Sequence, residues 1–286
     1  MGRSIGVIGA GLMGAEIALV FALAGHDVLL NDREQASLER ALSRLRTLME
    51  KGVPRGFYRQ DEIDPALARI KPQLDLAAFA DCAVITEAVF EALDVKTDLL
   101  KRLGAIVPAE VLIASNTSTI PISTLAAALP VDMRGRFIGT HYFSPVSRMQ
   151  LVEVIPSFDT TDETVAAVMA ILTKIGKTPI RVKDVAGFAV NRMLHAFIIE
   201  AVKLVEEGVA TPQDLDTACR LGLGHPMGPF ALMDAVTSSL CVQAQEIMQE
   251  AYGERFRPPA LLKQRVRAGY VGGKGKQGWY KPAAKG

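Results

Sequence analysis

A histidine and a glutamate stand twelve residues apart in two strand-like segments of the chain. His141 follows the apolar segment 137–140, and Glu153 lies inside the apolar segment 151–155. A buried carboxylate without a partner is costly, and two neighbouring strands joined by a short loop would place Glu153 beside His141. A neutral imidazole can accept a hydroxyl proton near neutral pH, and a carboxylate on its other nitrogen fixes the tautomer. The pair is therefore a candidate acid–base dyad, with a core histidine and an edge-strand glutamate as the alternative.

Two further polar residues lie where an α/β protein could bind a ligand. Ser118 comes just after the apolar segment 111–115, at the expected carboxyl end of a strand, and open α/β sheets bind ligands at that end. Asn191 falls in the first turn of a long apolar helix, where a buried amide must find a hydrogen-bond partner. A turn serine and a local structural hydrogen bond are the alternatives for these two residues.

A glycine-rich loop joins the first apolar segment of the chain to the first helix. In the pattern GxGxxG, the first glycine permits a tight turn, the second lets backbone approach a pyrophosphate, and the third lets the helix pack closely. The helix terminus then offers its free N–H groups to the phosphates. Asp32 stands 23 residues after Gly9, where a carboxylate accepts hydrogen bonds from the adenosine ribose and repels a 2′-phosphate. We therefore expect NAD rather than NADP or a flavin. The loop residues are Gly9, Gly11, Leu12, Met13 and Gly14.

Strand-like and helical segments alternate along the first two-thirds of the chain. This alternation predicts a parallel sheet covered on both faces, a Rossmann-type doubly wound α/β domain over residues 1–184. After residue 184 the strand pattern ends, and an all-helical domain, 185–286, begins with a long helix at 188–207 that is apolar over most of its surface. The expected strands are 5–8, 27–30, 83–86, 111–115, 137–140, 151–155 and 178–182. The expected helices of the first domain are 12–24, 35–50, 95–107 and one that is capped at 160–163 and ends near 174.

Composition and charge exclude several classes of protein. The 286 residues suit about two domains, and 49% hydrophobic with 22% charged residues is ordinary for a folded protein with a sizeable core. Lys and Arg number 32 and Asp and Glu 31, so the net charge is 32 − 31 = +1, which argues against a nucleic-acid partner. The three cysteines are odd in number and form no CxxC, which indicates a reducing compartment and no metal site.

Hydropathy bears on membranes and on subunit contacts. The most apolar early stretch, 17–24, has 8 residues, whereas a membrane-spanning helix needs about 20. No signal-peptide pattern begins the chain, so we expect a cytoplasmic protein that does not bind membranes. The mean hydropathy of +0.22 is high for such a protein and indicates apolar surface buried between subunits. We expect a homodimer that forms through the C-terminal helical domain.

Several of these motifs, in this order, make the chain resemble the 3-hydroxyacyl-CoA dehydrogenases. The resemblance covers essentially the whole chain, and the combination of motifs is far more specific than the glycine loop alone. It implies a fold with an NAD-binding Rossmann-type domain and a substrate L-3-hydroxyacyl-CoA, with 3-hydroxybutyryl-CoA as a short-chain example. The matching segments are 9–14, 87–91 with Lys96, 115–118, 141–145, 151–155, 187–192, 224–229 and 278–280.

The resemblance also implies roles for single residues. His141 is the general base for substrate oxidation and the acid for reduction, and Glu153 orients it. Ser118 and Asn191 contact the hydroxyl or thioester region of the substrate. The implied cofactor contacts outside the glycine loop are Glu91, Lys96, Ser144 near the nicotinamide, and Lys274 in the C-terminal tail.

The sequence departs from the family pattern at three places. Ser144 stands where many members have asparagine, and serine is shorter with fewer hydrogen-bond donors. Ala92 replaces a common asparagine. The segment between Asp32 and Cys82, which carries a CoA-contacting helical hairpin in the family, matches poorly. Three basic residues there could meet CoA phosphates or form a solvated turn: Lys51, Arg55 and Arg59.

Other functions remain open from the sequence alone. A relative that acts on L-gulonate, or on a 3-hydroxyacyl group bound to a carrier protein, would share the glycine loop, the dyad and the fold. The β-hydroxyacid dehydrogenases have a similar loop but use a lysine on a long helix, and here Lys203 lies late in that helix. A non-enzymatic NAD-binding relative is the remote alternative, because the positions of His141, Glu153, Ser118 and Asn191 are all filled.

Overall fold

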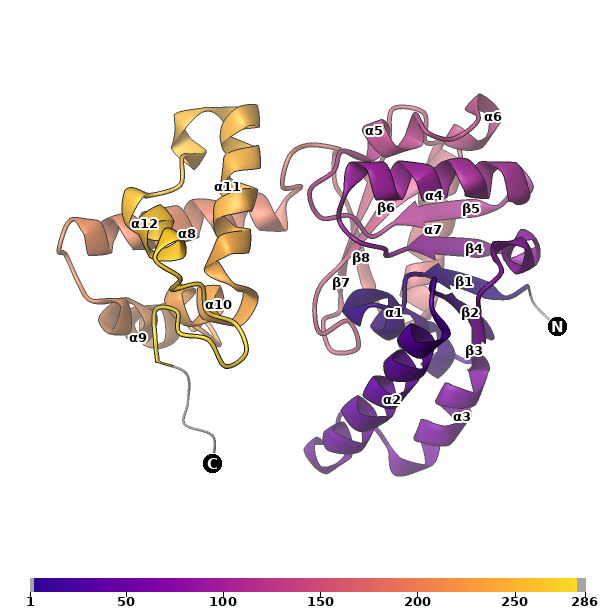
Figure 1. Cartoon of the computed structure of the whole chain (residues 1–286), viewed down its shortest axis with the longest axis horizontal. Coiled ribbons are helices and arrows are strands. Elements are labelled where there is room, and N and C mark those ends of the chain that lie inside the picture. The colour runs from indigo at the N-terminus through magenta and orange to yellow at the C-terminus, as the bar shows by residue number, and fades with distance from the viewer. Residues whose placement is uncertain (1–2, 282–286) are drawn as a thin grey trace. The chain divides into compact units, whose positions relative to one another are not determined.

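The computed structural model describes residues 3–281 of the chain, which forms two compact units (Figure 1). The first unit is Met1–Val185 and the second is Ala186–Gly286. Each has its own buried apolar cluster, as expected of separate domains.

An eight-stranded sheet forms the centre of the first unit, in the order β3-β2-β1-β4-β5-β6-β7-β8. β1 pairs in parallel with both β2 and β4, so the strand order reverses beside β1, as in a Rossmann-type sheet. This confirms the predicted fold class. The strands are β1 (Ile5–Ile8), β2 (Val28–Asn31), β3 (Ile70–Gln73), β4 (Val84–Glu87), β5 (Leu112–Ser115), β6 (Phe137–Tyr142), β7 (Leu151–Pro156) and β8 (Thr178–Arg181).

One strand pair departs from the expected parallel arrangement. β6 and β7 run antiparallel, whereas the neighbouring pairs β5–β6 and β7–β8 are parallel. Only residues 143–150 separate β6 from β7. A parallel connection needs a crossover of a dozen or more residues, so this loop can only reverse the chain into a hairpin.

Helices pack on the strands of the first unit. α1 is buried along nearly its whole length and packs against β1, β2, α2 and α3, while α4 packs against α5. Beyond the sheet, α2 and α3 lie side by side (Figure 1). These helices are α1 (Leu12–Leu23), α2 (Gln35–Gly52), α3 (Ile63–Arg69), α4 (Leu93–Ile106), α5 (Ile122–Ala126), α6 (Val131–Arg134) and α7 (Asp162–Lys174).

The structure also differs from the sequence-based expectations elsewhere in this unit. The polar stretch before residue 73 holds α3 and the edge strand β3, which were not predicted. α3 buries only Ile63 and Ala66, too few apolar positions to give a helical period. The cap of α7 is Thr161, whose hydroxyl accepts a hydrogen bond from the Thr164 N–H at 3.2 Å, and not Thr160. The Thr160 hydroxyl instead donates to the Phe137 carbonyl at 2.6 Å.

The second unit is helical, and residues 186–281 contain no strand. Its long helix buries one face and leaves the other in solvent, with Met193 67% exposed, so it is amphipathic in the single chain and not buried all round as expected. The C-terminal segment packs on this unit, because the Asp234 carboxylate accepts hydrogen bonds from the backbone N–H groups of Trp279 and Tyr280. The helices are α8 (Val190–Glu206), α9 (Pro212–Gly222), α10 (Pro229–Val236), α11 (Ser238–Tyr252) and α12 (Ala260–Arg267).

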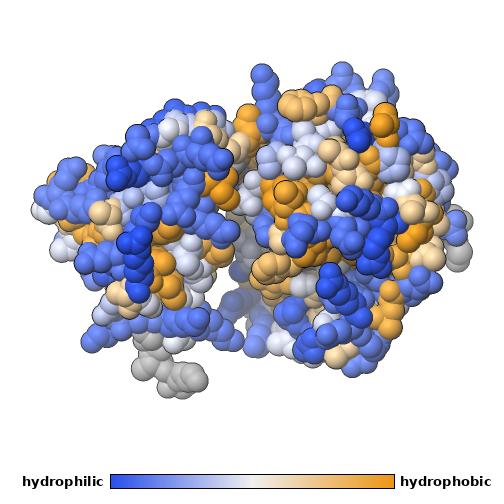
Figure 2. Space-filling model, turned by 45° about the horizontal axis from the view of Figure 1, so that its top comes forward, coloured by the Kyte–Doolittle hydropathy of each residue, from blue (hydrophilic) through white to orange (hydrophobic). Residues whose placement is uncertain are grey.

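The surface of the chain is mostly polar, with apolar side chains between the polar ones. Hydrophilic residues, blue in Figure 2, cover much of the visible face of both units. Among the described residues, no helix is both long enough and apolar enough to cross a bilayer.

A buried histidine makes the stability of the second unit depend on pH. His195 lies on the buried face of α8 at 6% exposure, and burial lowers its pKa from 6.5 to about 4. Below about pH 6.5, His195 is therefore protonated in the unfolded chain but stays neutral in the folded one. The free energy of unfolding therefore falls as the pH drops below about 6.5. Between pH 7 and pH 5 we expect His195 to cost about 2 kcal/mol of unfolding free energy.

Denaturant unfolding of the wild type and of His195→Leu at pH 7 and pH 5 measures this cost. The leucine variant should lose less stability over the interval. The matched control is His225→Leu, because His225 is exposed in the same unit. Equal pH losses in the wild type and in His195→Leu would contradict the assignment.

Candidate active site

The glycine loop leaves β1 and enters α1 in the way a bound pyrophosphate requires. Gly9 has a φ of +103°, and a Cβ there would lie 2.5 Å from the Ala88 carbonyl oxygen. A Cβ on Gly14 would lie 1.8 Å from the Gly9 oxygen, so the helix starts against its own loop. A Cβ on Gly11 would meet nothing within 4 Å. Gly11 therefore faces open space at a helix N-terminus, where a phosphate can approach the backbone.

Asp32 fixes this loop from the end of β2. Its carboxylate accepts hydrogen bonds from the backbone N–H groups of Ala10 and Arg33, both at 2.8 Å. Arg44 of α2 donates to the carbonyl oxygens of Ala10 and Gly11, at 3.2 and 2.8 Å. The cavity beside the loop has a volume of about 890 Å³. Its lining includes Gly9, Gly11, Leu12, Met13 and Asp32.

These residues fit a dinucleotide cofactor. The open space at Gly11 admits a phosphate, and the Asp32 carboxylate at the cavity wall has lone pairs left for ribose hydroxyls. A carboxylate there disfavours the additional phosphate of NADP, so the chemistry of the cavity suits NAD.

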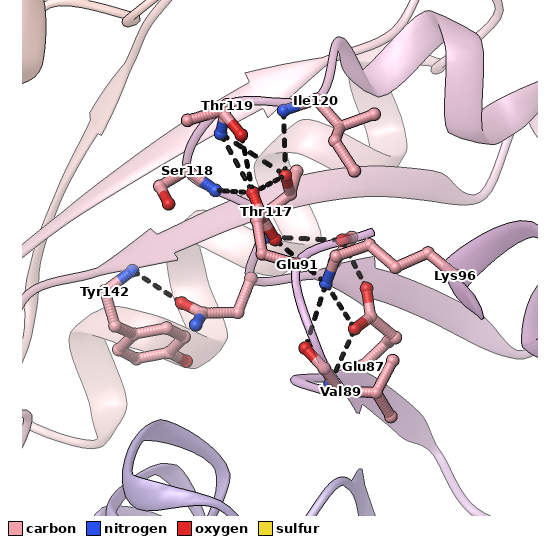
Figure 3. Close-up of polar contacts among 11 residues, drawn as sticks. Glu87, Val89, Glu91, Lys96, Thr117, Ser118, Thr119, Ile120 and Tyr142 are labelled. Carbon is pink, nitrogen blue, oxygen red and sulfur yellow. Dashed lines mark hydrogen bonds and ion pairs between the residues drawn. The ribbon is translucent and has the colours of Figure 1, made fainter. Parts of the chain in front are cut away.

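Glu91 organises the loop that follows β5 (Figure 3). Its Oε1 accepts the Thr117 hydroxyl at 2.6 Å and the backbone N–H groups of Ser118 and Thr119 at 2.9 and 3.0 Å. Burial alone would raise the pKa of Glu91, but the charge of Lys96 and these hydrogen bonds outweigh it and hold the pKa below its usual range. Glu91 is therefore ionised at neutral pH, and it fixes the backbone of Ser118 while the hydroxyl of that residue points away from it (Figure 3).

A second carboxylate, to which the sequence alone assigns no role, lies beneath this loop. Glu87, at the end of β4, accepts hydrogen bonds from Lys96 Nζ and Ser115 Oγ, each at 2.6 Å. The backbone N–H of Val89 adds a third at 2.7 Å. Glu87 and Lys96 are 0% and 1% exposed, and Lys96 Nζ also lies 3.2 Å from Glu91. A charged residue in an apolar strand is the signal that could have revealed Glu87, as it did for Glu153.

His141 and Glu153 face each other across the β6–β7 hairpin. They are register partners in that antiparallel pair, and His141 Nδ1 lies 2.8 Å from Glu153 Oε2. Both are buried, at 6% and 0% exposure. The Asn116 side chain accepts a hydrogen bond from the Tyr142 N–H at 3.0 Å and so joins the end of β5 to the end of β6. Because Nδ1 faces the carboxylate, the contact favours the tautomer of a neutral imidazole that carries its hydrogen on Nδ1.

The structure thus gathers several of the predicted site residues in the first unit and leaves others apart. Ser118, Glu91 and Lys96 lie where β4 and β5 end, next to the hairpin of His141 and Glu153, while Ser144 is exposed in the loop after β6. Asn191 is half-buried in the first turn of α8, and Lys274 is exposed in the C-terminal segment. These last two belong to the second unit, and their roles, like those of the other site residues, remain predictions.

The sheet order, the glycine loop and the cavity define a Rossmann-type dinucleotide-binding protein. Family models agree over nearly the whole chain. The model of the 3-hydroxyacyl-CoA dehydrogenase NAD binding domain matches residues 4–185, and that of the C-terminal domain matches residues 187–282. The chain belongs to the 3-hydroxyacyl-CoA dehydrogenase family, and it is an NAD-dependent oxidoreductase, as the resemblance predicted.

Individual relatives support this placement along the full length. A probable 3-hydroxybutyryl-CoA dehydrogenase of Deinococcus radiodurans is 42% identical over 96% of this chain and 99% of its own. The mitochondrial hydroxyacyl-coenzyme A dehydrogenase of Sus scrofa is 36% identical over 98% of this chain and 91% of its own. The crystal structure of (S)-3-hydroxybutyryl-CoA dehydrogenase from Ralstonia eutropha superposes with a TM-score of 0.93 at 36% identity, over 99% and 100% of the two chains.

Proposed function

We propose that the protein interconverts a short-chain (S)-3-hydroxyacyl-CoA and the corresponding 3-oxoacyl-CoA, with 3-hydroxybutyryl-CoA as its substrate. The observation that carries the proposal is the buried contact of 2.8 Å between His141 and Glu153. The strand of His141 is paired with β5, and Ser118 follows the carboxyl end of β5. The substrate assignment draws on the names of the relatives from Deinococcus radiodurans and Ralstonia eutropha.

In this proposal the protein moves one proton. Bound NAD supplies the acceptor for the hydride that leaves C3 of the substrate. As C3 loses hydride, His141 Nε2 takes the proton of the 3-hydroxyl group, and the carbonyl forms. Glu153 holds the neutral tautomer before this step and stabilises the imidazolium after it. In reduction, His141 returns the proton to the same oxygen.

In this proposal, other residues of the chain bind and orient the substrate and the cofactor. Ser118 and Asn191 hold the hydroxyl or thioester region of the substrate. Four residues lie beside the bound cofactor: Glu91, Lys96, Ser144 and Lys274. The Glu91 network supports the assignment of Ser118, because four of its hydrogen bonds fix the loop that presents this residue.

A basic cavity on the first unit supports CoA as the carrier of the acyl group. The cavity has a volume of about 400 Å³, and four cationic side chains line it: Arg44, Lys51, Arg55 and Arg148. Phosphate groups are recognised by such clusters. Of the basic residues singled out in the sequence, Lys51 and Arg55 lie at this cavity, whereas Arg59 pairs with Asp61 at the surface. A free sugar acid such as L-gulonate carries no phosphate for the cluster to bind.

The second unit offers the surface for the proposed homodimer. Several of its large apolar side chains are more than half exposed, and contact between two copies would remove them from water. Sedimentation of the intact protein at micromolar concentration tests the dimer, and a mass of one chain would contradict it. The exposed side chains are Met193, Val209, Leu221, Leu223 and Leu240.

The state of the cysteines supports the proposed cytoplasmic location. Cys82, Cys219 and Cys241 are all free and buried. Burial raises the pKa of Cys82 to about 11 and that of Cys241 to about 12, so both remain thiols at neutral pH. Fractionation of the native host cells tests the location, and recovery outside the cytoplasm would contradict it.

Oxidation of NADH in the presence of candidate substrates tests the function. The panel contains acetoacetyl-CoA, longer 3-oxoacyl-CoA thioesters, acetoacetyl groups on a carrier protein, and, with NAD, L-gulonate. We expect the highest kcat/KM with acetoacetyl-CoA and (S)-3-hydroxybutyryl-CoA as the product. Turnover of L-gulonate or of the carrier-bound substrate without turnover of acetoacetyl-CoA would contradict the proposal.

A further inference from the structure

The loop that connects the two strands of the dyad is anchored from outside the hairpin. Within residues 143–150, the Ser147 hydroxyl accepts a hydrogen bond from the Tyr58 hydroxyl at 2.6 Å. The Ser147 N–H donates to Glu16 Oε2 at 3.3 Å, and Glu16 is only 4% exposed. The loop is therefore tied to α1 and to the segment after α2, far from its own strands in the sequence.

A buried lysine that follows the loop in the sequence also holds it in place. Lys177, in the turn before β8, donates to the carbonyl oxygens of Val146 and Met149, the latter at 2.9 Å. It is 7% exposed, and burial lowers its pKa, although the charge of Glu16 opposes this effect. Since buried polar groups with satisfied partners order their surroundings, the position of the loop between His141 and Glu153 depends on these contacts.

Tyr58 also belongs to the wall of the basic cavity. Its ring is buried against the end of α2, where a Cβ on Gly52 would lie 2.4 Å from a ring carbon. The loop supplies a second wall residue, Arg148, whose guanidinium lies 5.1 Å from the centre of the Phe57 ring. The cavity and the dyad loop thus meet at two contacts, Tyr58 with Ser147 and Phe57 with Arg148.

We propose that Tyr58 is a positioning residue that couples occupancy of the basic cavity by a phosphorylated nucleotide to the placement of the dyad loop. The inference rests on the proposed function, in which the nucleotide is that of CoA. Binding energy from a remote, non-reacting part of a substrate raises kcat only where it is transmitted to the reacting centre. The 2.6 Å hydrogen bond between Tyr58 and Ser147 supplies that connection, because Ser147 lies in the short loop whose two ends carry His141 and Glu153.

The test compares two substrates that differ only in the remote part. Acetoacetyl-CoA carries the phosphorylated nucleotide, and acetoacetyl-pantetheine keeps the thioester arm without it. We expect Tyr58→Phe to lower the ratio of kcat for the CoA thioester to kcat for the pantetheine thioester by about three- to tenfold, the usual effect of one hydrogen bond. Ser147→Ala should lower the ratio by a similar factor, and the double variant no further, because the two changes remove one interaction.

The matched control is Tyr270→Phe, an exposed tyrosine of the second unit, which should keep the ratio of the wild type. If the ratio of the two kcat values in Tyr58→Phe equals that of the wild type, as it would with equal fold losses of kcat on both substrates, the coupling is overturned. Turnover of acetoacetyl-CoA by the wild type would still uphold the proposed function. Failure of the wild type to turn over acetoacetyl-CoA would overturn both.

Discussion

Replacing His141 by alanine should lower kcat for the reduction of acetoacetyl-CoA by about three orders of magnitude, because the variant has no group at that position to donate the proton. The side chain is buried beside Glu153 and is not part of the lining of the nucleotide cavity. NADH affinity, measured by fluorescence titration, should therefore remain close to that of the wild type. The loss belongs to the chemical step, so it should appear in single-turnover measurements with saturating substrate.

His26 provides the control for this experiment. It lies in the turn between α1 and β2, where its ring packs edge-on against Phe21 with 6.0 Å between the ring centres. His26→Ala should keep the activity of the wild type. If His141→Ala retained full activity, His141 would not be the acid–base group, and a lysine of the kind used by β-hydroxyacid dehydrogenases would have to be sought.

Glu153→Gln should produce the second large effect, a fall in kcat of about 10²- to 10⁴-fold. Glutamine keeps the size of the side chain but has no charge to stabilise the imidazolium, and its amide can favour the wrong tautomer of His141. Glu153 is fully buried with its Oε2 2.8 Å from His141 Nδ1, so water cannot replace the lost interaction well.

This second prediction is checked by kinetics together with thermal unfolding. The midpoint of unfolding should change little, because a neutral amide is less costly to bury than a carboxylate. Glu163→Gln, an exposed position in the first turn of α7, is the matched control and should leave kcat unchanged. A kcat for Glu153→Gln within threefold of the wild type would show that the carboxylate does not serve the reaction.

The parts of the structure that the sequence predicted are those with local or strictly periodic signals. The glycine loop and the strands around it follow from residues that are close in the chain. The pairing of His141 with Glu153 followed from the short connection between their strands, although the hairpin that this connection requires was not predicted. α3 and β3 were missed because a short helix with two buried positions and an edge strand with Pro72 carry no such signal.

The remaining contacts of the site depend on residues that are far apart in the sequence. Tyr58 reaches Ser147 across 89 positions, and Lys177 reaches Val146 across 31. No spacing rule relates such residues, because the strand order of the sheet decides which loops meet. Glu87 was within reach of the sequence, since it is a charge at the end of an apolar strand, but its partners Lys96 and Ser115 are set by the packing of α4 and β5.

The pH dependence of kcat/KM for the oxidation of (S)-3-hydroxybutyryl-CoA by NAD tests the central claim most directly. If one group of the chain must be unprotonated to accept the hydroxyl proton, kcat/KM of the wild type should fall about tenfold per unit of pH at low pH. The residual activity of His141→Ala should lack this fall. A flat acid limb in the wild type, or the same fall in the alanine variant, would contradict the assignment of His141 as the base.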